Sequence, residues 1–281
     1  MLETLKSLVC GTVLEAPARR LHASLTGRPS AANPPAERDM AASNDGPAAE
    51  TPVTAESADA NATYDAQTAA VMARVLKRDS VCVDVGCHAG EILDEMRRLA
   101  PDGHHYAFEP LPDLYANLRT RYAHAGDVTL HNCALSDATG TFQFQHVISN
   151  PGYSGFRKRR YDRPSEQVVE TEVNAAPLDS ILPDGVTVAL IKIDVEGAEL
   201  QVLKGARATL RRCQPVVIFE HGLGAADVYA TRPEHIHALM AEAGLRIFLM
   251  QDWLADRPAL GLDAFAEEFD SGRNYYFMAA P

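Results

Sequence analysis

Four acidic residues stand at or near the ends of apolar runs that have the composition of strands. They are Asp84, Glu109, Asp194 and Glu220. Because the carboxyl ends of neighbouring parallel strands border one crevice, these side chains are expected to converge there. Four carboxylates in one cleft suit a cationic ligand. Their hard oxygen atoms equally suit a divalent ion such as Mg²⁺, for which Asp194 and Glu220 are the expected ligands. The sequence leaves both uses open.

A glycine-rich loop follows the first of these runs. It reads Asp84-Val85-Gly86-Cys87-His88-Ala89-Gly90, and such a turn between a strand and a helix lets the backbone approach a ligand closely. The loop lacks the G-x-G-x-x-G spacing of dinucleotide sites, and Asp84 would repel a diphosphate while favouring an ammonium or sulfonium group. A turn without a ligand role is the alternative. The loop predicts a site for a cationic cofactor, contacted by Asp84, Gly86, Cys87 and Gly90.

Residues after the second and third runs complete this predicted cofactor site. Glu109, followed by Pro110, ends the second run, where an acid holds a ribose diol by hydrogen bonds. A carboxylate that only stabilises the start of the next helix is the alternative. Ala134 and Leu135 follow the third run and would pack against a flat aromatic base.

The segment IKIDVEGAELQVLKGA, at residues 191–206, ends an apolar run in acidic residues. A reaction at a hydroxyl needs a group that removes its proton, and a positioned carboxylate or histidine does so. Asp194 and Glu196 are the first candidates for this base. His221 is the alternative, since its usual pKa of about 6.5 suits a base at neutral pH.

A basic and aromatic stretch, NPGYSGFRKRR, occupies residues 150–160. Cations beside aromatic rings bind anionic or sugar groups through charge and stacking. Tyr153, Ser154 and Arg157 are therefore the predicted substrate-binding residues. A solvated basic loop explains the stretch equally well.

Composition narrows the class of protein. The chain has 281 residues and a formal charge of −12, and an acidic chain does not attract phosphate backbones, so no nucleic acid partner is expected. The five cysteines match no zinc or disulfide spacing, which is typical of a reducing compartment. Without a run near the ~18 apolar residues that span a bilayer, we expect a cytoplasmic protein. The oligomeric state is not indicated.

Three regions follow one another along the chain. Residues 1–27 carry leucines at helical spacing and predict a short amphipathic helix that would make peripheral contact with a membrane or a partner, a frayed helix being the alternative. Residues 28–62 are rich in Ala and Pro and predict a disordered linker. Residues 63–281 are expected to form one folded domain.

Short apolar runs alternate with helical periodicity beyond Tyr64, an order typical of a parallel sheet covered by helices on both faces. The expected strands are Val81–Val85, His105–Glu109, Val128–Asn132, Val188–Asp194, Val216–Glu220, Arg246–Met250 and Tyr275–Met278. The expected helices are Asp65–Lys77, Gly90–Leu99, Pro112–His124, Ala198–Arg211 and Pro233–Ala243. Thr141–Val147 and Val168–Val173 alternate apolar and polar residues and predict a hairpin or an insertion beside the main sheet.

These motifs together resemble the FkbM family of methyltransferases, a branch of the class I fold that uses S-adenosylmethionine. The resemblance covers residues 64–281 and rests mainly on IKIDVEGAELQVLKGA. DVGCHAG, FEP at 108–110, NPGYSGF and PVVIFEHG at 215–222 are also similar. The resemblance implies an α/β, Rossmann-like fold with a seven-stranded, mostly parallel sheet, an antiparallel last strand and helices on both faces.

The resemblance also implies roles and an activity. It implies that Asp84, Gly86 and Gly90 contact the amino acid part of S-adenosylmethionine. It places Glu109 at the ribose, and Ala134 and Leu135 near the adenine. The implied activity is O-methylation of a hydroxyl on a sugar, a glycan or another small natural product. A noncatalytic cofactor-binding module, tethered to a membrane or partner by its N-terminal segment, is the alternative function.

Overall fold

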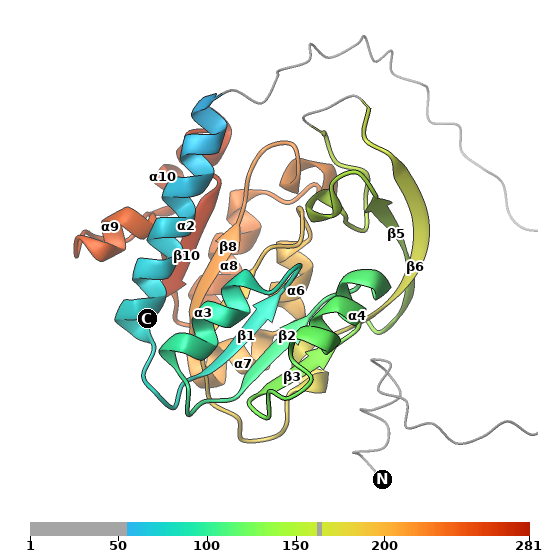
Figure 1. Ribbon diagram of the computed structural model, residues 1–281. Coiled ribbons are helices and arrows are strands. Elements are labelled where there is room, and N and C mark those ends of the chain that lie inside the picture. The colour runs from blue at the N-terminus through green and yellow to red at the C-terminus, as the bar shows by residue number, and fades with distance from the viewer. Residues whose placement is uncertain (1–54, 162–164) are drawn as a thin grey trace, which may run out of the picture.

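The computed structural model describes residues 55–161 and 165–281, and it shows a central sheet with helices on both faces (Figure 1). The amphipathic helix expected at residues 1–27 and the linker up to residue 54 lie outside the described residues. In the described ranges, no helix combines the length and the hydropathy needed to cross a bilayer.

The main sheet has seven strands in the order β3-β2-β1-β7-β8-β10-β9. Their bounds are Val128–His131, His105–Phe108, Val81–Val85, Val188–Ile193, Val216–Glu220, Tyr276–Ala280 and Arg246–Phe248. Neighbouring strands from β3 to β8 run parallel, whereas β10 is antiparallel to both β8 and β9. The central runs are apolar on both faces because helices cover both. The expected fold, including the antiparallel last strand, is confirmed.

Two helical layers enclose this sheet. The first layer contains α5 (Leu178–Ile181), α6 (Glu199–Gly205), α7 (Arg207–Cys213), α8 (Pro233–Glu242) and α10 (Leu262–Ser271). Its side chains Leu203, Ile236 and Phe265 pack against Val83 and other residues of the sheet. The other contains α2 (Ala55–Val75), α3 (Glu91–Leu99), α4 (Pro112–Arg121) and α9 (Met250–Leu254). We call this second side the α2 face. Side chains alternate along a strand, so every second residue of β1 or β7 points to the α2 face.

A smaller sheet stands beside the carboxyl ends of the main strands (Figure 1). It has the order β4-β6-β5, where β4 is Ala134–Leu135, β5 is Gly140–Val147 and β6 is Val168–Ala176. The antiparallel pairing of β5 with β6 confirms the expected hairpin. Phe144 and Val173 from this hairpin pack with Leu111 and Ala134. The small sheet therefore presents an apolar surface to the edge where the acidic residues were expected.

Helix α2 corrects the expected linker boundary. It begins at Ala55, so residues 55–62 belong to a helix and not to the linker predicted through residue 62. Alanine has the highest helix propensity, and Tyr64, Thr68, Val71 and Met72 bury one side of the helix. The polar, alanine-rich start is thus the continuation of an anchored helix.

The helix expected at Ala198–Arg211 is divided into α6 and α7. The break lies at Ala206, whose backbone has φ −112° and ψ 9°. Just before it, a Cβ on Gly205 would lie 2.1 Å from the backbone oxygen of Ser136. This close approach to the small sheet is a tertiary contact that helical periodicity does not reveal.

Candidate functional site

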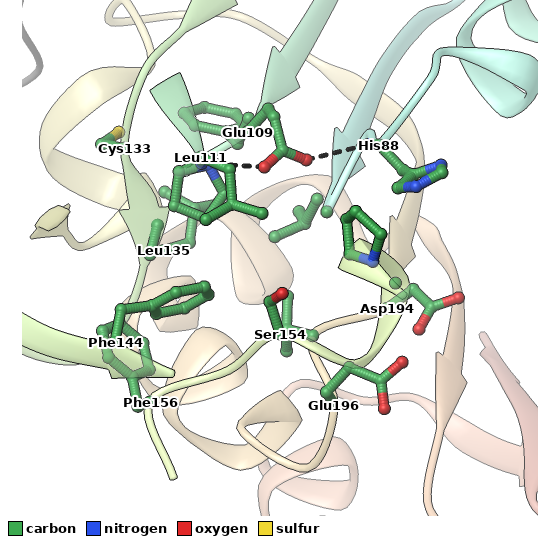
Figure 2. Close-up of a pocket in the computed structure, with 18 residues that line it drawn as sticks. His88, Glu109, Leu111, Cys133, Leu135, Phe144, Ser154, Phe156, Asp194 and Glu196 are labelled. Atoms are coloured by element: carbon green, nitrogen blue, oxygen red, sulfur yellow. Dashed lines mark hydrogen bonds between the residues drawn. The ribbon is translucent and has the colours of Figure 1, made fainter. Parts of the chain in front are cut away.

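A pocket opens at the carboxyl ends of β1, β2 and β7. It encloses about 560 Å³ of space not filled by atoms, its open mouth included. Figure 2 shows apolar side chains such as Leu135, Phe144 and Phe156 at one end and the carboxylates of Asp194 and Glu196 at the other. The pocket therefore has an apolar end and an acidic end.

Most of the predicted cofactor residues line this pocket. Gly86, Glu109, Pro110, Ala134 and Leu135 do so, as the positions after successive strands predicted. Among the other candidate residues, Ser154, Asp194 and Glu196 also line it. Asp84, Cys87 and Gly90, expected to contact the ligand directly, are not among the lining residues.

The contacts of the glycine loop show where Asp84 and Cys87 lie instead. The N–H groups of Gly86 and Cys87 both donate to the carbonyl oxygen of Phe108 at 3.0 Å, which fastens the loop to β2. Asp84 is 2% exposed and accepts a hydrogen bond from the thiol of Cys87. Burial raises the pKa of Asp84 to about 6. Asp84 thus contacts the loop through Cys87, and within the described residues its Oδ2 has no hydrogen-bond partner.

Gly86 joins this loop to the end of β7. Its φ is +79°, and a Cβ there would lie 1.9 Å from the backbone oxygen of Asp194. Gly185 has a similar φ of +82° but no atom near its added Cβ within 4 Å, so it is a matched control. Gly185→Ala should lower the free energy of unfolding by about 1 kcal/mol through the left-handed backbone alone. Gly86→Ala should cost about 2 kcal/mol more because the backbone of β7 must move.

Urea denaturation of both glycine variants measures this difference. Equal losses of unfolding free energy in the two variants would show that the contact between Gly86 and β7 imposes no steric restriction.

Glu109 faces the pocket while holding two loops together. Its Oε2 accepts the N–H of His88 and its Oε1 accepts the N–H of Leu111, each at 2.9 Å. Leu111 is the N-cap of α4, so Glu109 also serves the helix-entry role given as the alternative. Glu109 is 5% exposed, and burial raises the pKa of its carboxyl group to about 7. Each oxygen retains a second lone pair for a hydroxyl donor in the pocket.

An acidic cluster lies at this end of the pocket, where one carboxylate oxygen from each of Asp194, Glu196 and Glu220 lies within 4.8 Å of the others. Of the three residues, Asp194 and Glu196 line the pocket. Asp194 accepts hydrogen bonds from Lys192 and Tyr276, and Glu196 forms an ion pair with Arg159. The three acids come from the end of β7, the turn after it and the end of β8. Of the four acids expected to converge, Asp194 and Glu220 do so here, whereas Asp84 and Glu109 are not part of this cluster.

These carboxyl groups differ in their protonation. Burial opposes ionisation of Asp194, but the positive charge of Lys192 and the hydrogen bonds from Tyr276 and Lys192 outweigh it and lower its pKa. Burial, together with the charge of Asp194, raises the pKa of Glu220 to about 8. At neutral pH the end of β7 thus carries an ionised carboxylate beside a protonated one, an arrangement suited to a base.

Comparison with known proteins identifies the family. The sequence model of the methyltransferase FkbM domain matches residues 84–247, more than half of the chain. The chain belongs to this family. The match begins at Asp84 and includes the glycine loop, Glu109 and the acidic end of the pocket.

The chain is also similar to individual proteins that are named as methyltransferases. Methyltransferase sdnD of Sordaria araneosa is 33% identical over 153 residues, which are 44% of this chain and 59% of the relative. The 2-O-methyltransferase NoeI of Sinorhizobium fredii is 28% identical over 158 residues, 48% of this chain and 61% of the relative. The chain thus spans about three fifths of these curated relatives. A crystal structure of methyltransferase FkbM from Methylobacillus flagellatus is 17% identical, with a TM-score of 0.46 over 74% of this chain and 45% of that one.

His221 lies on the other side of the FkbM domain's sheet from the acidic cluster. It is 1% exposed and does not line the pocket. Its ring stacks on Phe269 of α10, with ring centroids 4.5 Å apart and planes 20° apart. Burial lowers its pKa to about 4. The structure therefore gives His221 no access to a ligand in this pocket.

Only one of the three predicted substrate residues lines the pocket. Ser154 lines it, and its hydroxyl accepts the N–H of Val147 at 3.0 Å. Tyr153 and Arg157 do not line it. The guanidinium of Arg157 donates to the carbonyl of Val228 and lies over the Tyr229 ring, so Arg157 fastens the loop to the segment after β8.

Sequence reasoning missed part of this FkbM pocket. Phe144 and Phe156 form the apolar end. Phe156 belongs to the aromatic stretch that was expected to bind substrate, whereas only the alternation of β5 suggested that Phe144 points inward. Lys192 and Tyr276 support Asp194. A lysine inside the otherwise apolar run VALIKI was the available signal, because a lysine is rarely buried unless it is paired.

Proposed function

We propose that this chain is an S-adenosylmethionine-dependent methyltransferase that methylates a hydroxyl on a sugar, a glycan or another small natural product. The observation that carries the proposal is one pocket with an apolar end, Glu109 at its side and Asp194 at its acidic end. We also propose that the methyltransferase domain begins with α2, at Ala55, and extends to Pro281.

The pocket's polarity suits the parts of this cofactor. Leu135, Phe144 and Phe156 offer apolar surface to an adenine ring. Glu109 offers unused lone pairs to the ribose hydroxyls. At the acidic end, carboxylate oxygens can accept hydrogen bonds from the ammonium group of the amino acid part. The side chains present therefore fit S-adenosylmethionine, with its adenine toward the hairpin and its methionine toward β7.

Asp194 is the proposed base. When bound, S-adenosylmethionine supplies a methyl group on a positively charged sulfur. Asp194 would hold the acceptor hydroxyl and take its proton, which would leave the oxygen free to accept that methyl group. Glu196, beside Asp194, is the proposed residue for orienting the acceptor. The relative NoeI is by name a 2-O-methyltransferase, which supports an oxygen acceptor.

Methyl labelling tests this function. The purified chain, incubated with methyl-labelled S-adenosylmethionine and extract of its native cell, should transfer label to a small hydroxyl compound or saccharide. Label on nitrogen, carbon or sulfur would contradict O-methylation. Absence of any transfer by a chain that still binds the cofactor would favour the noncatalytic binding module.

Chelation tests the acidic cluster as a metal site. Lys192 and Arg159 already pair with Asp194 and Glu196. A divalent ion at this cluster would therefore lie close to two fixed cations that already neutralise two of its carboxylates. We therefore expect methyl transfer in excess EDTA to stay within about twofold of the rate in Mg²⁺-saturated EDTA. A loss that Mg²⁺ restores would contradict this expectation.

A further inference from the structure

Lys192 is a buried cation in the middle of the sheet. It belongs to β7, is 5% exposed, and its register partner in β1 is Asp84. Because side chains alternate along β7, Lys192 and Asp194 point to the same α2 face. Burying an ammonium group is costly unless it is paired, so the contacts of Lys192 indicate why it is there.

Those contacts form a closed triangle with Asp194 and Tyr276. The Nζ of Lys192 donates to the Oδ2 of Asp194 at 3.1 Å and to the hydroxyl oxygen of Tyr276 at 3.0 Å. The Tyr276 hydroxyl in turn donates to the same Oδ2. The tyrosine oxygen thus accepts from the lysine and donates to the aspartate, so the roles of all three groups are consistent.

Both hydrogen bonds converge on one oxygen of Asp194. In the part of the chain that the structure describes, no hydrogen bond reaches its Oδ1, and the Asp194 side chain is 36% exposed. Two bonds on Oδ2 fix the rotation of the carboxylate. The other oxygen is left for a ligand in the pocket.

We propose that Lys192 and Tyr276 are positioning residues that hold Oδ2 of Asp194 so that Oδ1 receives the proton of the acceptor hydroxyl. This inference rests on the proposed function. Tyr276 comes from β10, the strand inserted antiparallel between β8 and β9, so the inserted strand supplies part of the support for the base. Among the described residues, the other charged groups near Asp194 include Arg159 and the acids Asp84, Glu196, Glu199 and Glu220.

Tyr276→Phe tests this role with the least change in packing, because only one hydroxyl is lost. Its neighbour provides a matched control: the hydroxyl of Tyr275 donates to Asn61, outside the triangle. Tyr276→Phe should lower kcat by at least about tenfold, while the Kd of S-adenosylhomocysteine and the Tm stay near those of the wild type. Tyr275→Phe should leave kcat unchanged. Lys192→Arg, which keeps the charge, should retain more activity than Lys192→Met.

The outcomes separate the two proposals. An active wild type whose Tyr276→Phe variant is equally active would overturn the positioning role and leave the function intact. Equal kcat losses in the two tyrosine variants, or a Tyr276→Phe defect explained by weaker cofactor binding alone, would overturn it as well. A folded wild type that binds no S-adenosylhomocysteine would overturn the proposed function and this inference with it.

Discussion

Asp194→Asn is expected to lower kcat by about 10² to 10⁴-fold, the usual contribution of a positioned general base. The amide keeps the size and shape of the carboxylate but cannot take a proton at neutral pH. In the wild type, Lys192 and Tyr276 hold this carboxylate by one oxygen, and the other oxygen is the proposed proton acceptor. The lost activity should therefore appear in the rate of the chemical step. The Kd of S-adenosylhomocysteine, measured by calorimetry, should change far less than kcat.

Asp102→Asn is the matched control for this change. Asp102 forms an exposed ion pair with Arg78 and precedes β2, at the opposite edge of the sheet from the pocket. The Asp102→Asn variant should have the same kcat as the wild type. A fully active Asp194→Asn variant would move the role of base to another group, and Glu196 would be tested next.

Cofactor binding is expected to weaken about tenfold between pH 8 and pH 6 because of Glu109, whose pKa burial raises to about 7. The ribose hydroxyls donate most strongly to the ionised carboxylate, so binding lowers this pKa and releases a proton. A group whose pKa falls on binding makes affinity decline as pH drops through the pKa of the free protein. The free carboxyl is mostly protonated at pH 6, and the complex must then expel that proton. Calorimetry of S-adenosylhomocysteine in buffers of different ionisation enthalpy measures both the affinity and the proton release.

Glu109→Gln should bind more weakly at pH 8 and lose most of the pH dependence. Glu95→Gln is the control, since Glu95 lies on α3 in an ion pair with Arg98, whose hydrogen bond lowers its pKa. It should keep the wild-type profile. An unchanged pH dependence in Glu109→Gln would show that another group, such as Asp84, releases the proton.

The sequence predicted best where a local pattern decides the structure. The bounds of β1 and β8 agree with expectation because each strand is a short apolar run between polar residues. Glu109 and Asp194 reached the pocket because the ends of parallel strands meet at one edge.

Prediction failed where the position of a side chain depends on the face of the sheet to which it points, or on an element distant in the sequence that it contacts. Glu220 and His221 are neighbours, yet one approaches Asp194 while the other stacks on Phe269. Adjacent residues in an extended chain point to opposite faces, so only one of the two could join the acidic cluster. Asp84 shares the α2 face with Asp194, but it is buried next to the Cys87 thiol and does not line the pocket. The apolar end arises from the hairpin folding over the sheet edge, a long-range contact that no local pattern contains.

Calorimetric titration of the folded chain with S-adenosylhomocysteine tests the central claim most directly. We predict saturable binding of one molecule per chain, displaced by S-adenosylmethionine and weakened by Glu109→Gln. Absence of binding by the folded wild type at pH 8 would contradict the assignment of this pocket to the cofactor.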